Sequence, residues 1–283
     1  MLDVAIVGAG ELGGSVAHRL AACDVVSTIC LVDEAGSIAA GKALDIMQAA
    51  PIQRFAARVA GATDIAAALG ASIIVIADRA AGGASPGSEI EEALLLLKRI
   101  CGSTAKPLIL CAGAGHRELV ERGARELGVS RTRLFGSAPE ALASAVRSVV
   151  AIEAGVSPRD VALTVLGIPP SRAVVPWEDA TIGGLSAVRL LDTPAQRRLE
   201  ARVPQLWPPG PHALAAAAVK AIDILFGGSR QVMSCFVAPD DSAGRRTRAA
   251  AFPARLGRGG VEHVETPPLT TRDRVALDNA VLL

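Results

Sequence analysis

Short, continuous apolar runs alternate with amphipathic stretches through the first half of the chain. Residues 4–7 form one such run, which is typical of a strand buried on both faces of a sheet. Similar runs predict strands at 28–32, 73–77 and 108–112, and helical periodicity predicts helices at 12–22, 41–49 and 89–100. Because strand and helix alternate to about residue 140, we expect this half to form a doubly wound parallel sheet of the α/β class.

The second half has a different pattern, with helical stretches first and short strands closer to the end. Its predicted helices are residues 141–154, 193–203, 213–226 and 271–281, and its predicted strands are 160–166, 232–237, 249–254 and 261–264. Proline-rich breaks fall at 168–171 and 207–211. We therefore expect two domains, an α/β domain of residues 1–138 and an α+β domain of residues 139–283.

A glycine-rich segment lies between the first predicted strand and the first predicted helix. It reads Gly8-Ala9-Gly10-Glu11-Leu12-Gly13, and Asp33 follows at the end of the next strand. In this arrangement Gly8 permits a tight turn, Gly10 lets a pyrophosphate approach the backbone, and Gly13 lets helix and strand pack closely. The N–H groups and the dipole at the start of the helix favour phosphate groups.

These features predict a Rossmann-type dinucleotide site. Asp33 would accept hydrogen bonds from ribose hydroxyls and would repel a 2′-phosphate, which favours NAD over NADP. The predicted cofactor-binding residues are Gly8, Gly10, Glu11, Leu12, Gly13 and Asp33. The alternative is a Rossmann fold that keeps its glycines for packing and has lost its ligand.

Charge and composition exclude several other classes. The chain has 29 lysines and arginines against 28 acidic residues, so its net charge of +1 gives no electrostatic basis for binding nucleic acid or a membrane surface. A hydrophobic content of 51% excludes a disordered chain. Five cysteines without metal-site spacing predict neither a disulfide framework nor a bound metal. Since the sequence shows no signal-peptide pattern and no membrane-length apolar stretch, we expect a cytoplasmic protein.

Several segments resemble the malate/lactate dehydrogenase family, in particular its malate dehydrogenase branch. The resemblance is carried by the glycine-rich segment, by Asp33, by residues 41–46 (GKALDI), and near the C-terminus by residues 259–264 (GGVEHV) and 277–281 (LDNAV). Residues 61–64 (GATD) and 70–75 (GASIIV) also fit, so the resemblance covers the chain from end to end. It implies an NAD-binding half, a catalytic half, and a homodimer or homotetramer.

Enzymes of this family reduce a 2-keto acid by hydride transfer from the nicotinamide. A cation must hold the substrate carboxylate, a donor must polarise the ketone, and an acid must protonate the developing alkoxide. The resemblance implies arginines in a loop, an asparagine after a strand, an aspartate and an arginine on a helix, and a histidine in a turn.

This chain departs from the family pattern at each of these places. The loop at 80–89 (AAGGASPGSE) carries no arginine, and Arg79 stands where the family usually has a glycine. The strand expected to end in Thr-Asn-Pro reads CAGAG at 111–115. Residues 141–145 (ALASA) replace the helix pattern Leu-Asp-x-x-Arg, and Pro169 stands at the position of the catalytic histidine. Because loss of the acid alone lowers a rate ~10²–10⁴-fold, the combined changes predict loss of 2-hydroxy-acid oxidation.

Any imidazole chemistry must come from the histidines at positions 18, 116, 212 and 263. His116 follows the glycine-rich end of a predicted strand, and His212 precedes a helix that borders the substrate pocket in the family. Both are candidate replacement acids, although a solvent-facing place at a helix start is the preferred interpretation of each.

Other charged residues are weaker candidates. Arg79, Arg147 and Arg172 could supply a new cation, for which surface charge is the ordinary interpretation. Glu178 and Asp179 are adjacent, so their side chains diverge and do not predict a metal site.

Two hypotheses follow. The first is a malate/lactate dehydrogenase-like NAD-binding protein that has lost the catalytic set and acts in nucleotide binding, sensing or scaffolding. The second is an active NAD-dependent oxidoreductase with a rebuilt substrate pocket that uses His116 or His212.

Overall fold

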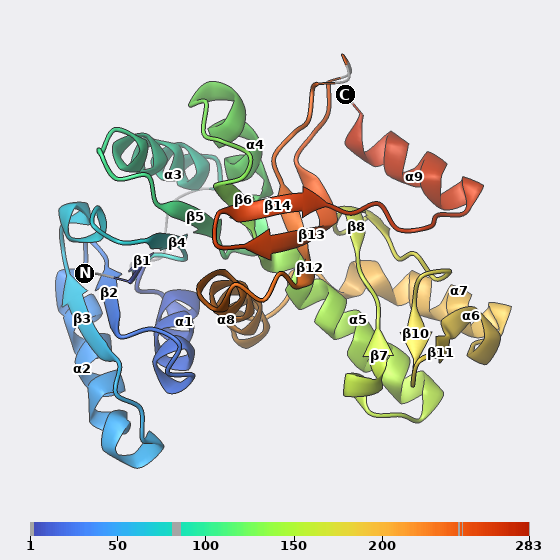
Figure 1. Ribbon diagram of the computed structural model, residues 1–283, viewed down its shortest axis with the longest axis horizontal. Coiled ribbons are helices and arrows are strands. Elements are labelled where there is room, and N and C mark those ends of the chain that lie inside the picture. The colour runs from blue at the N-terminus through green and yellow to red at the C-terminus, as the bar shows by residue number, and fades with distance from the viewer. Residues whose placement is uncertain (1–2, 81–85, 243, 245, 283) are drawn as a thin grey trace.

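A computed structural model describes residues 3–80, 86–242, 244 and 246–282 (Figure 1). The strands of the first half are β1 (Val4–Val7), β2 (Thr28–Val32), β3 (Arg58–Ala62), β4 (Ile73–Ile76), β5 (Leu108–Cys111) and β6 (Leu134–Gly136). The helices between them are α1 (Glu11–Ala22), α2 (Gly36–Gln53), α3 (Pro86–Cys101) and α4 (Arg117–Glu126), with short 3₁₀ helices η1 (Ile65–Ala68) and η2 (Ala114–His116).

These six strands pair in parallel in the order β3-β2-β1-β4-β5-β6. This is the strand order of a dinucleotide-binding fold, in which the direction of winding reverses between β1 and β4. The residues of β1 and β4 are apolar and, apart from the partly buried Val7, almost completely buried, because helices cover both faces of the sheet. The predicted α/β fold with a parallel-dominated sheet is confirmed.

The second half adds antiparallel strands and further helices. Its helices are α5 (Ala138–Ala154), α6 (Ala187–Leu190), α7 (Thr193–Arg202), α8 (Pro211–Gly227) and α9 (Thr271–Val281), with 3₁₀ helices η3 (Pro158–Asp160) and η4 (Val203–Leu206). Its strands are β7 (Val161–Ala162), β8 (Leu166–Ile168), β9 (Arg172–Val174), β10 (Thr181–Ile182), β11 (Leu185–Ser186), β12 (Val232–Val237), β13 (Ala250–Gly257) and β14 (Gly260–Val264).

The two halves share one sheet. Strand β12 pairs antiparallel with β6, β13 pairs with β12, β14 and β8, and a separate small sheet holds β11, β10 and β7. Helix α8, from the second half, packs beside α1 under the first half (Figure 1). The predicted boundary at residue 138 therefore divides the chain at the start of α5, just after β6, although β6 and β12 belong to one continuous sheet. The division into two domains stays a prediction. The expected homodimer or homotetramer also stays a prediction.

The structure differs from the sequence prediction in several places, and the short elements β9, β10, β11 and α6 are among those not predicted. The strand predicted at 160–166 is divided, because β7 joins the small sheet while β8 forms a hairpin with β9 on the main sheet. Strand β3 and helix α4 were not predicted, since β3 is made mostly of small residues with Val59 as its one buried side chain, and α4 buries only Leu119, Val120 and Gly123. In the described ranges, no helix has the length and apolar character needed to cross a membrane.

Candidate functional site

The carboxyl ends of β1, β2 and β4 meet at one edge of the sheet. Val7, the last residue of β1, is in register with Val32 of β2 and with Ile76 of β4. Gly8, Asp33 and Asp78, which follow these strands at this edge, are therefore brought together. In an open α/β sheet, this edge at the reversal of strand order is where ligands bind.

The glycine-rich segment forms a tight turn at this edge. Gly8 has φ = 107° and its N–H donates to the carbonyl oxygen of Val32 at 2.8 Å. A Cβ atom on Gly13 would clash with the carbonyl oxygen of Gly8, so glycine is needed for α1 to approach the turn. Glu11 and Leu12 begin the helix, whose N-terminus thus faces the edge of the sheet.

Asp33 is only 5% exposed and accepts three backbone hydrogen bonds. Its Oδ2 accepts from the N–H groups of Ala9 (2.7 Å) and Ala80 (2.8 Å), and its Oδ1 accepts from Ala35 (2.9 Å). Burial alone would raise the pKa of Asp33, but these donors and the Arg79 guanidinium outweigh it and hold the pKa below the usual value. The Asp33 carboxylate therefore ties the glycine-rich turn to the segment after β4.

Asp78 was not singled out in the sequence, yet it makes three hydrogen bonds with the glycine-rich segment. Its carboxylate accepts hydrogen bonds from the N–H groups of Leu12 (3.1 Å) and Gly13 (2.8 Å). Its backbone carbonyl accepts from the N–H of Gly10 at 2.9 Å. A Cβ atom on Gly10 would clash with the Asp78 carboxylate. The signal was available, because an acidic residue directly after the strand beside β1 must lie near the turn.

The residues at this edge therefore match the requirements of a dinucleotide site only in part. The turn, α1 and Asp33 are placed as such a site requires. The space over Gly10 and the N–H groups of Leu12 and Gly13, which a pyrophosphate would use, are taken by Asp78. In this conformation the residues present do not accommodate the pyrophosphate of NAD, and binding through the predicted set remains a prediction.

His116 lies at the same edge, at the end of η2 after β5. Its Nδ1 accepts a hydrogen bond from the N–H of Gly113 at 3.1 Å, which places the ring proton on Nε2. Burial lowers the pKa of His116 to about 4, although the Asp78 carboxylate favours the charged form. The imidazole is therefore uncharged at neutral pH.

The other histidines are in ordinary surroundings. His212 is exposed in the first turn of α8. On α1, His18 is exposed and its Nε2 lies 2.9 Å from the side-chain oxygen of Gln53. His263 on β14 lies 3.8 Å from the Glu265 carboxylate, and two thirds of its side chain is exposed.

Helix α5 presents apolar residues at the positions expected to carry the catalytic aspartate and arginine. Leu142, at the position expected for the aspartate, is fully buried and packs in an apolar cluster that includes Val165 and Trp177. Ala145, at the position expected for the arginine, is partly buried. This face of α5 therefore contributes packing and offers no carboxylate or cation.

The turn expected to carry the catalytic histidine is the hairpin between β8 and β9. Pro169 occupies the expected position and is buried, while Ser171 and Arg172 are exposed beyond it. The Arg172 guanidinium lies 3.4 Å from the carbonyl oxygen of Asn279 on α9. The hairpin thus packs beneath the C-terminal helix and presents no imidazole.

The arginines considered as replacement cations have partners of their own. Arg79 is ion-paired with Glu34 and with Glu92. Arg147 donates to Glu140 at 3.0 Å and to the carbonyl oxygen of Leu163 at 2.8 Å. Residues 81–85 of the loop lie outside the described residues. Glu178 and Asp179 are exposed in a turn, and the described part of the chain holds no cluster of three or more metal-ligating side chains.

Glu140 is a buried carboxylate that the sequence did not single out. One oxygen accepts from Lys220 (2.7 Å) and Arg147 (3.0 Å), and the other accepts from the N–H of Ser234 (2.9 Å). The Ser234 hydroxyl accepts in turn from the N–H of Val165 at 3.0 Å. Burial opposes ionisation of Glu140, but the two cations outweigh it and lower its pKa. The cluster joins α5, α8 and β12 behind the apolar face of α5.

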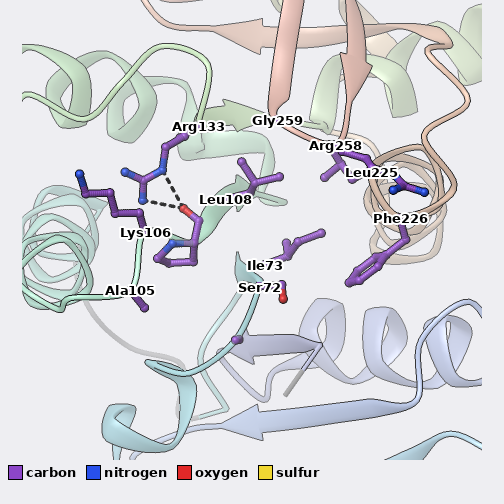
Figure 2. A pocket seen from close by; sticks show the side chains of 12 residues that line it. Ser72, Ile73, Ala105, Lys106, Leu108, Arg133, Leu225, Phe226, Arg258 and Gly259 are labelled. Carbon is purple, nitrogen blue, oxygen red and sulfur yellow. Dashed lines mark hydrogen bonds between the residues drawn. The ribbon is translucent and has the colours of Figure 1, made fainter. Parts of the chain in front are cut away.

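A cavity of about 770 Å³ opens at the opposite edge of the sheet, where β4 and β5 begin (Figure 2). Lys106, Arg133, Leu108 and Phe226 are among its lining residues. The Arg133 guanidinium is turned toward Pro107, whose carbonyl oxygen accepts from it at 2.8 and 3.1 Å. This cavity is separate from the glycine-rich edge and contains none of the predicted site residues.

No family model matches the sequence. Curated malate dehydrogenases are similar over nearly the whole chain. One from Thioalkalivibrio sulfidiphilus is 29% identical, covering 99% of this chain and 96% of the relative. One from Desulforudis audaxviator is 28% identical, covering 98% and 94%.

Solved structures show the same fold. A malate dehydrogenase from Salinibacter ruber has a TM-score of 0.86 and 23% identity, covering 99% of this chain and 94% of that one. A lactate dehydrogenase from Cryptosporidium parvum, in complex with lactic acid and NAD, has a TM-score of 0.85 and 19% identity with the same coverage. The fold of this chain is therefore the fold of these malate and lactate dehydrogenases, and the curated malate dehydrogenases are similar to it in sequence from end to end.

Proposed function

We propose that this chain is a malate/lactate dehydrogenase-like NAD-binding protein that does not oxidise 2-hydroxy acids by the family's route. Its role is then nucleotide binding, sensing or scaffolding. The observation that carries this proposal is the apolar face of α5, where a fully buried Leu142 replaces the carboxylate that would orient a histidine. Pro169 at the end of β8 supports it, because no imidazole stands at the expected place.

The size of the expected effect supports loss of activity rather than a slower enzyme. Absence of the general acid lowers the rate ~10²–10⁴-fold. Each charge-assisted contact to the substrate carboxylate that is missing removes about 1.5–3 kcal/mol of binding, or roughly a further tenfold to a hundredfold. Arg79 and Arg147 do not compensate, since each is already paired with carboxylates.

A paired experiment tests the proposal. NADH fluorescence is titrated with the purified protein, and reduction of oxaloacetate and of pyruvate is then followed at high protein concentration. We expect NADH binding with no turnover above the protein-free rate. Robust turnover of either keto acid would overturn the loss of activity, and no binding at millimolar NAD or NADH would overturn the nucleotide-binding role.

The second hypothesis, an active oxidoreductase with a rebuilt pocket, has one observation in its favour. His116 lies at the glycine-rich edge and carries its proton on Nε2, so it can donate a hydrogen bond. With a pKa of about 4, however, only about one molecule in a thousand is an imidazolium at pH 7. If turnover is found, its loss in His116→Ala would identify this residue as the donor, and unchanged turnover would exclude it.

A further inference from the structure

The N-terminus of α1 has an occupant that belongs to the chain itself. Asp78 meets the glycine-rich segment in three places: its carboxylate accepts from Leu12 and Gly13, and its carbonyl oxygen accepts from Gly10. We propose that the Asp78 carboxylate is an internal competitor for the phosphate-binding end of α1, and that it sets the affinity of this chain for dinucleotides. The inference rests on the proposed nucleotide-binding function and concerns the same site.

The geometry is that of a bound anion. A carboxylate at a helix N-terminus accepts backbone N–H groups and is favoured by the helix dipole, as a phosphate group would be. The two N–H donors lie 3.1 and 2.8 Å from the Oδ2 and Oδ1 atoms of Asp78 respectively, so each carboxylate oxygen has a donor. Gly10 leaves room for this approach, because a Cβ atom there would overlap the carboxylate.

A pyrophosphate cannot share this place with Asp78. The two anions would compete for the same N–H groups, and a pyrophosphate beside an ionised Asp78 would be repelled. The neighbouring His116 imidazole does not neutralise the carboxylate, since its pKa is about 4. A dinucleotide therefore binds only when the Asp78 side chain leaves the end of α1.

The Asp78 side chain can leave, because it is exposed to solvent and its carboxylate is held by only two hydrogen bonds. Capping contacts of this kind change an equilibrium by about twofold to thirtyfold. The competition is thus expected to weaken dinucleotide binding without abolishing it. A protein that holds NADH loosely and exchanges it quickly suits a sensing role better than a catalytic one.

Two substitutions separate the parts of this contact. Asp78→Ala removes the carboxylate, and Asp78→Asn keeps its shape while removing the charge. The matched control is Asp192→Asn, which changes an aspartate that caps another helix by accepting from the N–H of Ala195 at 2.7 Å. NADH fluorescence titration gives the dissociation constant of each protein. Amide hydrogen exchange at Leu12 and Gly13 reports the contact without any ligand.

We expect Asp78→Ala to bind NADH about twofold to thirtyfold more tightly than the unsubstituted protein, with Asp78→Asn between them and Asp192→Asn unchanged. Exchange at Leu12 and Gly13 should become faster in Asp78→Ala. If the unsubstituted protein binds NADH and neither Asp78 variant binds it more tightly, Asp78 is not an internal competitor. The nucleotide-binding function would then still stand. If only the Asp78 variants bind NADH, Asp78 is an internal competitor, and the proposal that the native chain binds NAD is overturned. No binding by any variant would overturn both.

Discussion

At the scale of single residues, Asp33 combines a predicted role in ribose binding with a structural role in the fold. Its position after β2 is the one that predicts a ribose contact, yet its carboxylate already accepts the N–H groups of Ala9, Ala35 and Ala80. These bonds hold the glycine-rich turn and the segment after β4 against each other. Asp33 therefore stabilises the folded protein whether or not a nucleotide is bound.

Asp33→Asn should lower the free energy of unfolding by about 2 kcal/mol at pH 7, since hydrogen bonds to an ionised group are worth about 1.5–3 kcal/mol and an amide satisfies these donors incompletely. The folded pKa of Asp33 lies below its unfolded value. Its contribution is therefore complete above about pH 4 and is lost as the pH falls through the folded pKa.

Urea denaturation at pH 7, 5 and 3 measures this effect, and the difference between the two proteins should be smallest at pH 3. Asp64→Asn is the control, because the exposed Asp64 accepts a single N–H from Ala66 and should change stability much less. An equal loss in the Asp33 variant at all three pH values would contradict the role given to its charge.

At the scale of elements, α5 is held in the fold by apolar packing and by a buried carboxylate. One face places Leu142 in an apolar cluster with residues of the small sheet. Near Leu142 on the same helix, the Glu140 carboxylate is buried and pairs with Arg147 and Lys220. These contacts, with the hydrogen bond from Ser234, link α5 to α8 and β12. Arg147, which was considered as a replacement cation for the substrate carboxylate, is the residue of α5 that pairs with Glu140.

Glu140→Gln should destabilise the fold by about 3 kcal/mol, because removing one partner of a buried ion pair leaves the remaining charges without compensation. Glu153→Gln is the matched control on the same helix, since Glu153 pairs with the exposed Arg198 and such surface pairs contribute about 1 kcal/mol or less. Equilibrium denaturation at pH 7 compares them. Equal losses in the two variants would contradict the importance of the buried cluster.

At the scale of the whole molecule, the sequence predicted the parallel sheet because its strands are continuous apolar runs, and it predicted the glycine-rich turn because the residue types are specific to it. It did not predict β3, whose residues are mostly small, or α4, whose residues are largely polar. Asp78 and Glu140 were missed because their importance depends on partners distant in the sequence. For Asp78 the sequence held one usable sign, its position directly after the strand predicted at 73–77, whereas for Glu140 it held no sign of Arg147 or Lys220 as partners.

We propose that this chain keeps the dehydrogenase fold and has lost hydride transfer to 2-keto acids. A single-turnover experiment tests it most directly. Protein in large excess over NADH is mixed with saturating oxaloacetate, so that the NADH is bound, and absorbance at the nicotinamide band is followed. We expect the absorbance to fall no faster than in the protein-free control. Oxidation of the bound NADH faster than in the control would contradict the loss of hydride transfer, whether or not His116→Ala abolishes it.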